Sequence, residues 1–95
     1  MEFLVRIRVS LPPDLPTDQV TQLRSRELAH GRQLRAAGRI VRLWRVPGTT
    51  SNVGIWSADT AEELHSAISG LPMFPWLHVT VEPLALHPVE DTDEF

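Results

Sequence analysis

Cysteine and lysine are both absent from the 95 residues of this chain, and no long apolar run occurs. The lack of cysteine excludes disulfides, thiolate metal sites and cysteine nucleophiles. Because a small secreted domain usually needs disulfides, we expect a cytoplasmic protein. No apolar stretch approaches the ~20 residues that span a bilayer, so we expect no membrane contact. The first residues show no basic start before an apolar run, which argues against a signal peptide.

Charge is unevenly distributed. The net charge is −3 at pH 7, and four of the twelve acidic residues fall within the last six positions. The other eight acidic residues nearly balance nine arginines, so the body of the chain is almost neutral. No basic stripe with interleaved aromatics occurs, which argues against nucleic-acid binding. Hydrophobic residues make up 42% of the chain, enough for one packed domain.

Most catalytic and cofactor motifs are also missing. The sequence has no P-loop, no Gly-x-Gly-x-x-Gly and no His-Glu-x-x-His pattern. Its four histidines show no ligand-like spacing. We therefore expect neither a metal site nor a bound cofactor.

Four segments are predicted to be strands, and residues 3–9 and 76–82 show the alternation of apolar and polar residues that is typical of half-buried strands. The first covers residues 3–9, and the next two, 39–46 and 51–57, flank a Pro-Gly turn and predict a hairpin. The fourth covers residues 76–82, and Pro83 is expected to end it because proline cannot donate to a ladder.

Two helices are predicted between these strands. The first begins with Thr17 as its N-cap and ends at Gly38. The second begins with a capping box that starts at Thr60 and ends at Gly70. Gly31, inside the first helix, is either a weak point or a site of close packing. The apolar stripe of the first helix consists of Val20, Leu23, Leu28, Leu34 and Ala37.

The element order β-α-β-β-α-β predicts a ferredoxin-like α+β sandwich, with an antiparallel sheet and two helices on one face. We expect this domain to cover residues 1–87 and an acidic C-terminal tail to cover 88–95. The alternation places an apolar set on the uncovered sheet face, and a face of that kind normally finds a partner, so we expect a homo-oligomer. That set is Leu4, Trp44, Trp56 and Trp76.

Arg24 and Glu27 stand three residues apart and are therefore neighbours on one helical face. A carboxylate partly desolvated at the edge of the apolar stripe would have a raised pKa, suited to taking a proton from carbon. The competing interpretation is an ordinary surface salt bridge between the two, which spacing alone favours.

A second candidate group lies in the hairpin. Trp44 beside Arg45 can form one wall of an anion pocket, or an oligomer-facing indole with an arginine at its rim. Asn52 is unusual in a strand and can donate to an oxyanion, or can mark the hairpin end. His65 and His87 are expected to be packing or surface groups when spacing alone is considered.

Taken together, these residues resemble the muconolactone isomerase family, without gaps over nearly the whole chain. The Leu-Trp-Arg and Leu-Pro-x-Phe-Pro signatures, at this separation, are the most specific part of the resemblance. The matching residues are Leu11-Pro12, Thr21-Gln22-Leu23, Glu27, Gly38, Leu43-Trp44-Arg45, Gly48, Asn52, Leu64-His65, Leu71-Pro72, Phe74-Pro75 and His87-Pro88.

The resemblance implies a cytoplasmic, cofactor-free homodecamer of ferredoxin-like subunits that acts in β-ketoadipate aromatic degradation. Its substrate would be muconolactone, a small lactone carboxylate, isomerised by an allylic proton shift to 3-oxoadipate enol-lactone. Glu27 would be the base, and Arg24 would bind the carboxylate or stabilise the dienolate. Asn52 would donate to the oxyanion. The resemblance assigns substrate contacts to Trp44, Arg45, His65, Phe74 and His87, the last from a neighbouring chain.

Two departures from the family pattern keep alternatives open. Relatives often carry an acid at the position of Arg26 and a His-Tyr pair at Thr49-Thr50. Both positions lie close to the predicted site, so a paralogue for a substituted lactone, or a chloromuconolactone dehalogenase, is an alternative. A non-catalytic oligomer that binds a small acid is another.

Overall fold

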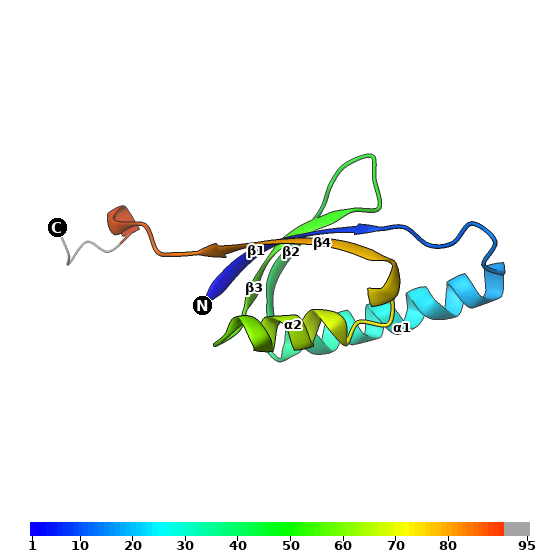
Figure 1. Cartoon of the computed structure of the whole chain (residues 1–95), viewed down its shortest axis with the longest axis horizontal. Coiled ribbons are helices and arrows are strands. Elements are labelled where there is room, and N and C mark those ends of the chain that lie inside the picture. Colours follow the sequence, from blue (N-terminus) through cyan, green and yellow to red (C-terminus); the bar gives the residue numbers. More distant parts are fainter. Residues whose placement is uncertain (91–95) are drawn as a thin grey trace.

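The structure is a computed structural model that describes residues 1–90, and within them it contains the predicted order of strands and helices (Figure 1). The strands are β1 Glu2–Val9, β2 Ile40–Arg45, β3 Asn52–Ser57 and β4 Leu77–Leu84. The helices are α1 Thr17–Ala36 and α2 Ala61–Ser69. Short 3-10 helices cover Phe74–Trp76 and Pro88–Glu90.

The four strands form one sheet in the order β2-β3-β1-β4, and every neighbouring pair is antiparallel. Both helices lie on the same face of this sheet, and no helix among residues 1–90 covers the other face (Figure 1). This arrangement confirms the predicted ferredoxin-like α+β fold. None of the helices among residues 1–90 is long and apolar enough to cross a membrane.

The core lies between the sheet and α2. The strand β1 turns Phe3, Val5 and Ile7 toward the helices, as the alternation predicts, and all three are buried. From α2, Leu64 and Ile68 close over them at i and i+4 spacing. These residues and their neighbours form one continuous apolar cluster that fixes both helices against the sheet.

Two tryptophans were wrongly predicted to lie on the uncovered face. Trp56 pairs with Phe3 in the ladder and is only 1% exposed, so it points into the core. Residues at odd and even positions of β3 are both apolar, and only strand pairing decides which of them face the helices. Trp76 lies in a 3-10 helix before β4 begins, so it is not part of a strand face.

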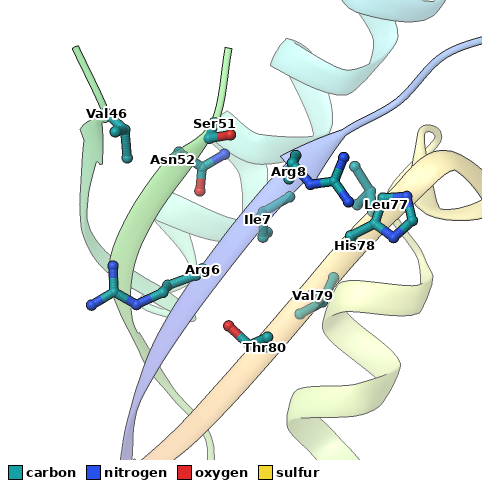
Figure 2. Close-up of a pocket in the computed structure, with 10 residues that line it drawn as sticks. All are labelled: Arg6, Ile7, Arg8, Val46, Ser51, Asn52, Leu77, His78, Val79 and Thr80. Carbon is teal, nitrogen blue, oxygen red and sulfur yellow. The ribbon is translucent and has the colours of Figure 1, made fainter. Parts of the chain in front are cut away.

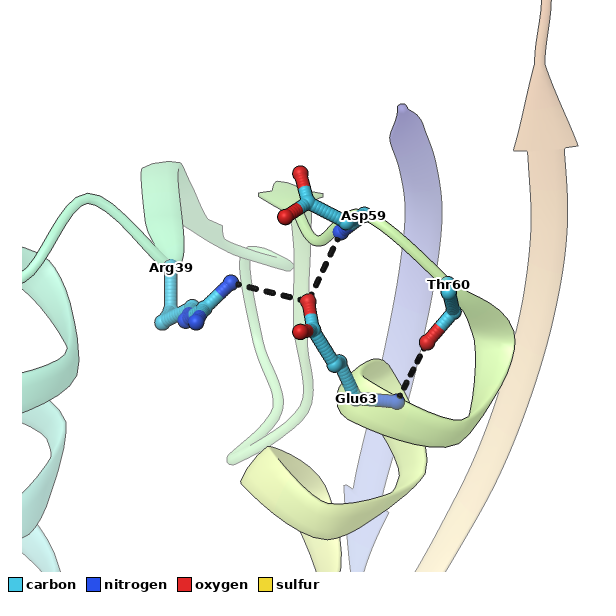
Figure 3. Close-up of polar contacts among 4 residues, drawn as sticks. All are labelled: Arg39, Asp59, Thr60 and Glu63. Carbon is cyan, nitrogen blue, oxygen red and sulfur yellow. Dashed lines mark hydrogen bonds and ion pairs between the residues drawn. The ribbon is translucent and has the colours of Figure 1, made fainter.

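The start of α2 confirms the predicted capping box, and Figure 3 shows its contacts. The Thr60 hydroxyl accepts a hydrogen bond from the Glu63 backbone N–H at 3.1 Å. The Glu63 carboxylate reaches back to the backbone N–H of Asp59 at 2.9 Å, one residue before the cap. It also forms an ion pair with Arg39 at 3.4 Å, which ties α2 to the start of β2.

The long helix α1 differs from the prediction at two places. Thr17 is its first helical residue and not its N-cap, because Pro16 occupies the cap without a side-chain hydrogen bond. Leu28 is 56% exposed, so it does not belong to the core stripe. Leu23 is the buried residue of this helix. Gly38 has φ +78° directly after the C-cap, as expected of a terminating glycine.

The last strand, β4, continues past its predicted end. Pro83 lies within the strand and pairs with Phe3 of β1. Because β4 is at the edge of the sheet, a residue without an N–H can face away from the ladder there. Val81 pairs with the buried Val5 of β1 but is itself 41% exposed, because it lies on the edge strand of the sheet.

Candidate active site

A cavity of about 810 Å³ opens between α1 and the helix-covered face of the sheet. The sheet supplies its apolar floor, and the connector from α2 to β4 closes one side. The lining residues are Ile7, Val9, Leu11, Arg24, Glu27, Leu28, Gly31, Arg32, Arg35, Ile40, Arg42, Leu43, Arg45, Thr50, Asn52, Trp56, Leu71, Met73 and Leu77. Polar groups at the rim of an apolar pocket are typical of small-molecule sites.

One face of α1 forms a wall of this cavity. Arg24, Glu27 and Leu28 line it together with Gly31 and Arg35, at spacings of three to four residues. This is the periodicity of a single helical face. The exposed position of Leu28 is therefore explained by an open cavity at the place where a core was predicted.

Glu27 is fixed by a backbone contact from a distant part of the chain. The N–H of Met73 donates to Glu27 Oε1 at 3.0 Å. Met73 lies in a turn closed by a hydrogen bond from the Phe74 N–H to the Leu71 carbonyl at 2.9 Å. The turn directs the Met73 N–H toward α1, and the 46 residues between donor and acceptor make this a tertiary contact.

The environment of Glu27 raises the pKa of its carboxyl above the ordinary value of 4.5, chiefly because partial burial removes water from the charged form. The Met73 N–H and the charge of His30 act in the opposite direction and lower it. Desolvation is the larger effect. A carboxylate in this state is a stronger base than one on an open surface, as the sequence predicted for a group at the edge of the stripe.

The charged groups around Glu27 are otherwise all positive. Five of the six charged residues that line the cavity are arginines, and Glu27 is the sixth. The simple salt bridge between Arg24 and Glu27 is not formed. Among residues 1–90, Arg39 and Glu63 make the one ion pair within 4.0 Å. An arginine-rich rim with one carboxylate favours an anionic ligand whose reaction requires a base.

Arg45 and Asn52 reach the same cavity from the hairpin. They are paired in the β2–β3 ladder, and Asn52 also pairs with Ile7 on the helix-covered side of β1. Arg45 donates to the Thr50 carbonyl at the hairpin turn, which orients its guanidinium. The side-chain oxygen of Asn52 is buried and has no hydrogen-bond partner in the part of the chain that is described.

Four of the predicted substrate contacts lie outside this cavity. Trp44 pairs with Val53 and is 46% exposed, with the Arg42 guanidinium 5.4 Å from its ring centroid. His65 and Phe74 contact one another edge to face at 6.3 Å, and neither lines the cavity. The structure therefore brings together Glu27, Arg24, Arg45 and Asn52, and not these aromatic groups.

His87 is the fourth of these residues. It follows β4 on the segment that leads away from the domain, where its Nδ1 accepts a hydrogen bond from the Val89 N–H at 3.0 Å (Figure 1). Pro88–Glu90 form a short 3-10 helix. The rest of the predicted acidic tail lies outside the described residues.

A second hollow of about 710 Å³ lies across β1 and β4, as Figure 2 shows. Arg6, Arg8, His78 and Thr80 occupy alternate positions of the two strands on the uncovered side of the sheet. Asn52 borders both hollows. No carboxylate lines this one, so it lacks the base that distinguishes the Glu27 cavity.

Four features of the cavity were missed by the sequence analysis: Arg32, Arg35, Arg42 and the Met73 N–H. Arg32 and Arg35 follow Arg24 at helical spacing, so their shared face was detectable from periodicity. The Met73 N–H has no sequence signal, because a backbone donor depends only on how the connector turns.

Comparisons with known proteins identify relatives over nearly the whole chain. The sequence profile of the family described as Muconolactone delta-isomerase matches residues 1–90. The Muconolactone Delta-isomerase of Cupriavidus pinatubonensis is 42% identical over 88 residues, covering 93% of this chain and 96% of that protein. The enzyme of the same name from Acinetobacter baylyi is 38% identical and covers 99% of this chain and 98% of its own length.

Solved structures give the same result for the fold. A crystal structure of muconolactone isomerase superimposes with a TM-score of 0.87 at 33% identity, covering 93% of this chain and 92% of that one. A 5-chloro-2-hydroxyhydroquinone dehydrochlorinase from Burkholderia phenoliruptrix, in complex with 2,5-dihydroxybenzoquinone, superimposes with a TM-score of 0.67 at 21% identity, over 94% and 98% of the two chains. At that identity the second likeness concerns the fold alone.

Proposed function

Because the chain belongs to the muconolactone delta-isomerase family, we propose that it isomerises muconolactone to 3-oxoadipate enol-lactone with Glu27 as the base. The observation that carries the proposal is the placement of Glu27. It is the one carboxylate in a cavity whose other charged side chains are arginines, and a backbone N–H from Met73 holds one of its oxygens.

The reaction moves one double bond by one position and needs only proton transfer. A proton leaves the ring carbon that bears the acetate side chain, and the electron pair of that C–H bond forms a new ring double bond. The old double bond shifts and places negative charge on the lactone carbonyl oxygen. A proton then returns to the carbon next to that carbonyl, so atoms and charge balance without a cofactor.

Glu27 is suited to both proton transfers. The raised pKa makes the Glu27 carboxylate a stronger base. It also brings that pKa closer to the working pH, at which the group must both accept and return a proton. Oε1 is engaged by the Met73 N–H, whereas Oε2 accepts no hydrogen bond from residues 1–90. A fixed carboxylate with one unengaged oxygen needs little reorganisation as the proton moves.

Arg24, Arg45 and Asn52 complete the proposed site. Arg24 stands one helical turn before Glu27, where it would bind the substrate carboxylate or stabilise the dienolate. Arg45 would anchor the carboxylate from the opposite wall. The Asn52 amide, buried and without a partner for its oxygen, would donate its N–H to the carbonyl oxygen as charge develops there.

We also propose that the functional unit is a homo-oligomer, a decamer in the family pattern, in the cytoplasm. On the uncovered sheet face, Glu82 of β4 pairs directly with Leu4 of β1, and Arg6 follows Leu4 two residues along β1. Arg8 and His78 extend the basic end (Figure 2). A second copy stacked in the opposite direction would place acidic ends on basic ends over an apolar centre.

In such an assembly, Trp44 and His87, which this chain does not bring to its own cavity, would serve a neighbouring copy. Trp44 faces the uncovered side, and His87 lies on the segment after β4 that extends from the domain (Figure 1). His65 and Phe74 would close the cleft from α2 and the connector. The division into a catalytic domain, residues 1–87, and a tail, 88–95, is part of this proposal.

Ultraviolet absorbance with muconolactone as substrate tests the function, with Glu27→Gln as the variant. The proposal predicts turnover by the natural chain and a loss of kcat of about 10²- to 10⁴-fold in Glu27→Gln, the usual contribution of a general base. Glu62→Gln is the matched control, because this exposed carboxylate lies on α2 outside the cavity. It should keep full activity.

Three outcomes would contradict the proposal. Full activity in Glu27→Gln would remove Glu27 as the base. Binding of muconolactone without turnover by the natural chain would indicate a binding module. Chloride release from a chlorinated lactone, without isomerisation of muconolactone, would indicate a dehalogenase.

A further inference from the structure

Among residues 1–90, no contact and no backbone angle requires glycine at position 31. A Cβ built at Gly31 meets nothing within 4 Å, so the predicted close packing is not present. The other glycines, all within residues 1–90, have reasons of their own. Gly38 and Gly48 have positive φ, and Cβ atoms at Gly54 and Gly70 would press on backbone oxygens at 2.5 Å and 3.3 Å.

A glycine in the middle of a 20-residue helix is also costly. It lowers helix stability relative to alanine because the unfolded chain has more conformations to lose. The cost falls in α1, which already buries little apolar surface. A position that weakens its own helix and packs against nothing therefore serves something other than the fold.

The location of Gly31 connects it with the cavity that contains Glu27. It lies four residues after Glu27, one helical turn along the same face, and both line the same cavity. A side chain at this position would project beside the carboxylate, where the substrate ring must lie for a proton to be taken from it. The lining of the same cavity also includes the apolar side chains of Trp56 and Leu71.

We propose that Gly31 makes room beside the base for a substituent on the lactone ring, so that the preferred substrates include muconolactones bearing an alkyl group. The inference rests on the proposed isomerase function and specifies its substrate class. The substituent must be on a carbon of the ring double bond. The carbon bearing the acetate side chain has to keep the hydrogen that Glu27 removes.

The test compares unsubstituted muconolactone with a muconolactone methylated on a double-bond carbon, in the natural chain and in Gly31→Ala. The natural chain should convert both. In Gly31→Ala, kcat/KM for the methylated lactone should fall about 10- to 200-fold relative to the unsubstituted one, the range for one methyl group in a hydrophobic pocket. The thermal midpoint of Gly31→Ala should rise by about 2–8 °C, as expected when a helical glycine is replaced.

Ala29→Gly is the matched control, because Ala29 is exposed on the same helix and does not line the cavity. It should lower the thermal midpoint and leave the ratio of the two kcat/KM values unchanged. A ratio that Gly31→Ala does not alter would overturn the inference. The inference would also be overturned if Gly31→Ala dissociated an oligomer and left the ratio of the two kcat/KM values unchanged. That result would mean that a second copy of the chain, and not the substrate, occupies the space beside Gly31. Conversion of neither lactone by the natural chain would instead count against the isomerase function itself.

Discussion

The two helices of this domain cover the same sheet but differ in what they contribute. Helix α2 has nine residues, two of them buried, and a complete set of capping contacts. Helix α1 has twenty residues, buries only Leu23 and begins without a side-chain cap. The shorter helix is therefore the better packed and the better terminated of the two.

This difference separates stability from chemistry. Apolar side chains of α2 point into the core, whereas the corresponding face of α1 borders an open cavity with Arg24, Glu27 and Gly31. A face that must admit a ligand cannot also be filled by core side chains. Substitutions in α2 should therefore affect folding first, and substitutions on the cavity face of α1 should affect turnover first.

The largest effect on stability is expected for Ile68→Ala in α2. Ile68 is 4% exposed within the core cluster, and truncating a buried isoleucine to alanine costs about 2–5 kcal/mol. Urea unfolding should show this loss, while kcat of the folded fraction stays within about twofold because Ile68 does not line the cavity. Ile68→Val should cost about 0.5–1.5 kcal/mol. A large fall in kcat without loss of stability would break the proposed separation.

An intermediate effect is expected when the Met73 N–H is replaced by an ester oxygen, which removes only the donor to Glu27. This N–H lowers the pKa of Glu27, so its loss should raise that pKa further. The acid limb of kcat/KM against pH should move upward by about one pH unit, the size of a lost charge-assisted hydrogen bond.

The matched control is the same ester replacement at Trp76, whose N–H donates to the Met73 carbonyl at 2.9 Å in the same connector. This change weakens the connector without touching Glu27. An equal shift of the acid limb in both esters would mean that general loosening, and not the contact with Glu27, sets the pKa.

The smallest effect is expected for Thr60→Ala at the cap of α2. The Thr60 hydroxyl accepts from the Glu63 N–H, and loss of such a cap costs about 1 kcal/mol. Thermal unfolding should show the loss, and Thr60→Ser should restore most of it. Unchanged stability in Thr60→Ala would show that α2 is held by its apolar face alone.

Much of the fold was predictable from the sequence. Alternation along β1 correctly indicated which side chains face the helices, and the Thr60 capping box located the start of α2. These signals depend only on residues close in sequence, so they can be recognised without knowing which strands pair with one another. The face on which Trp56 lies could not be predicted from neighbouring residues, because both faces of β3 carry apolar residues. Only the pairing of Trp56 with Phe3 decides which face it occupies.

The candidate site was predictable only in part. Helical spacing placed Arg24 beside Glu27 but favoured a salt bridge that residues 1–90 do not contain, and it gave no sign of the Met73 N–H that holds the carboxylate. The cavity depends on α1 standing off the sheet, and no side-chain pattern reports that separation. The assignment of Glu27 as a base therefore required the tertiary structure as well as the family resemblance.

The central claim is that Glu27, desolvated in an arginine-rimmed cavity, is the group whose ionisation controls turnover. The most direct test is to follow the Glu27 carboxyl by ¹³C NMR across pH in the free protein and to measure kcat/KM for muconolactone over the same range. The profile of kcat/KM reports ionisation in the free enzyme. The account predicts that both curves share one midpoint above 4.5, with activity present only on its alkaline side. A Glu27 carboxyl that titrates at or below 4.5, or a kinetic midpoint that does not coincide with it, would contradict the claim.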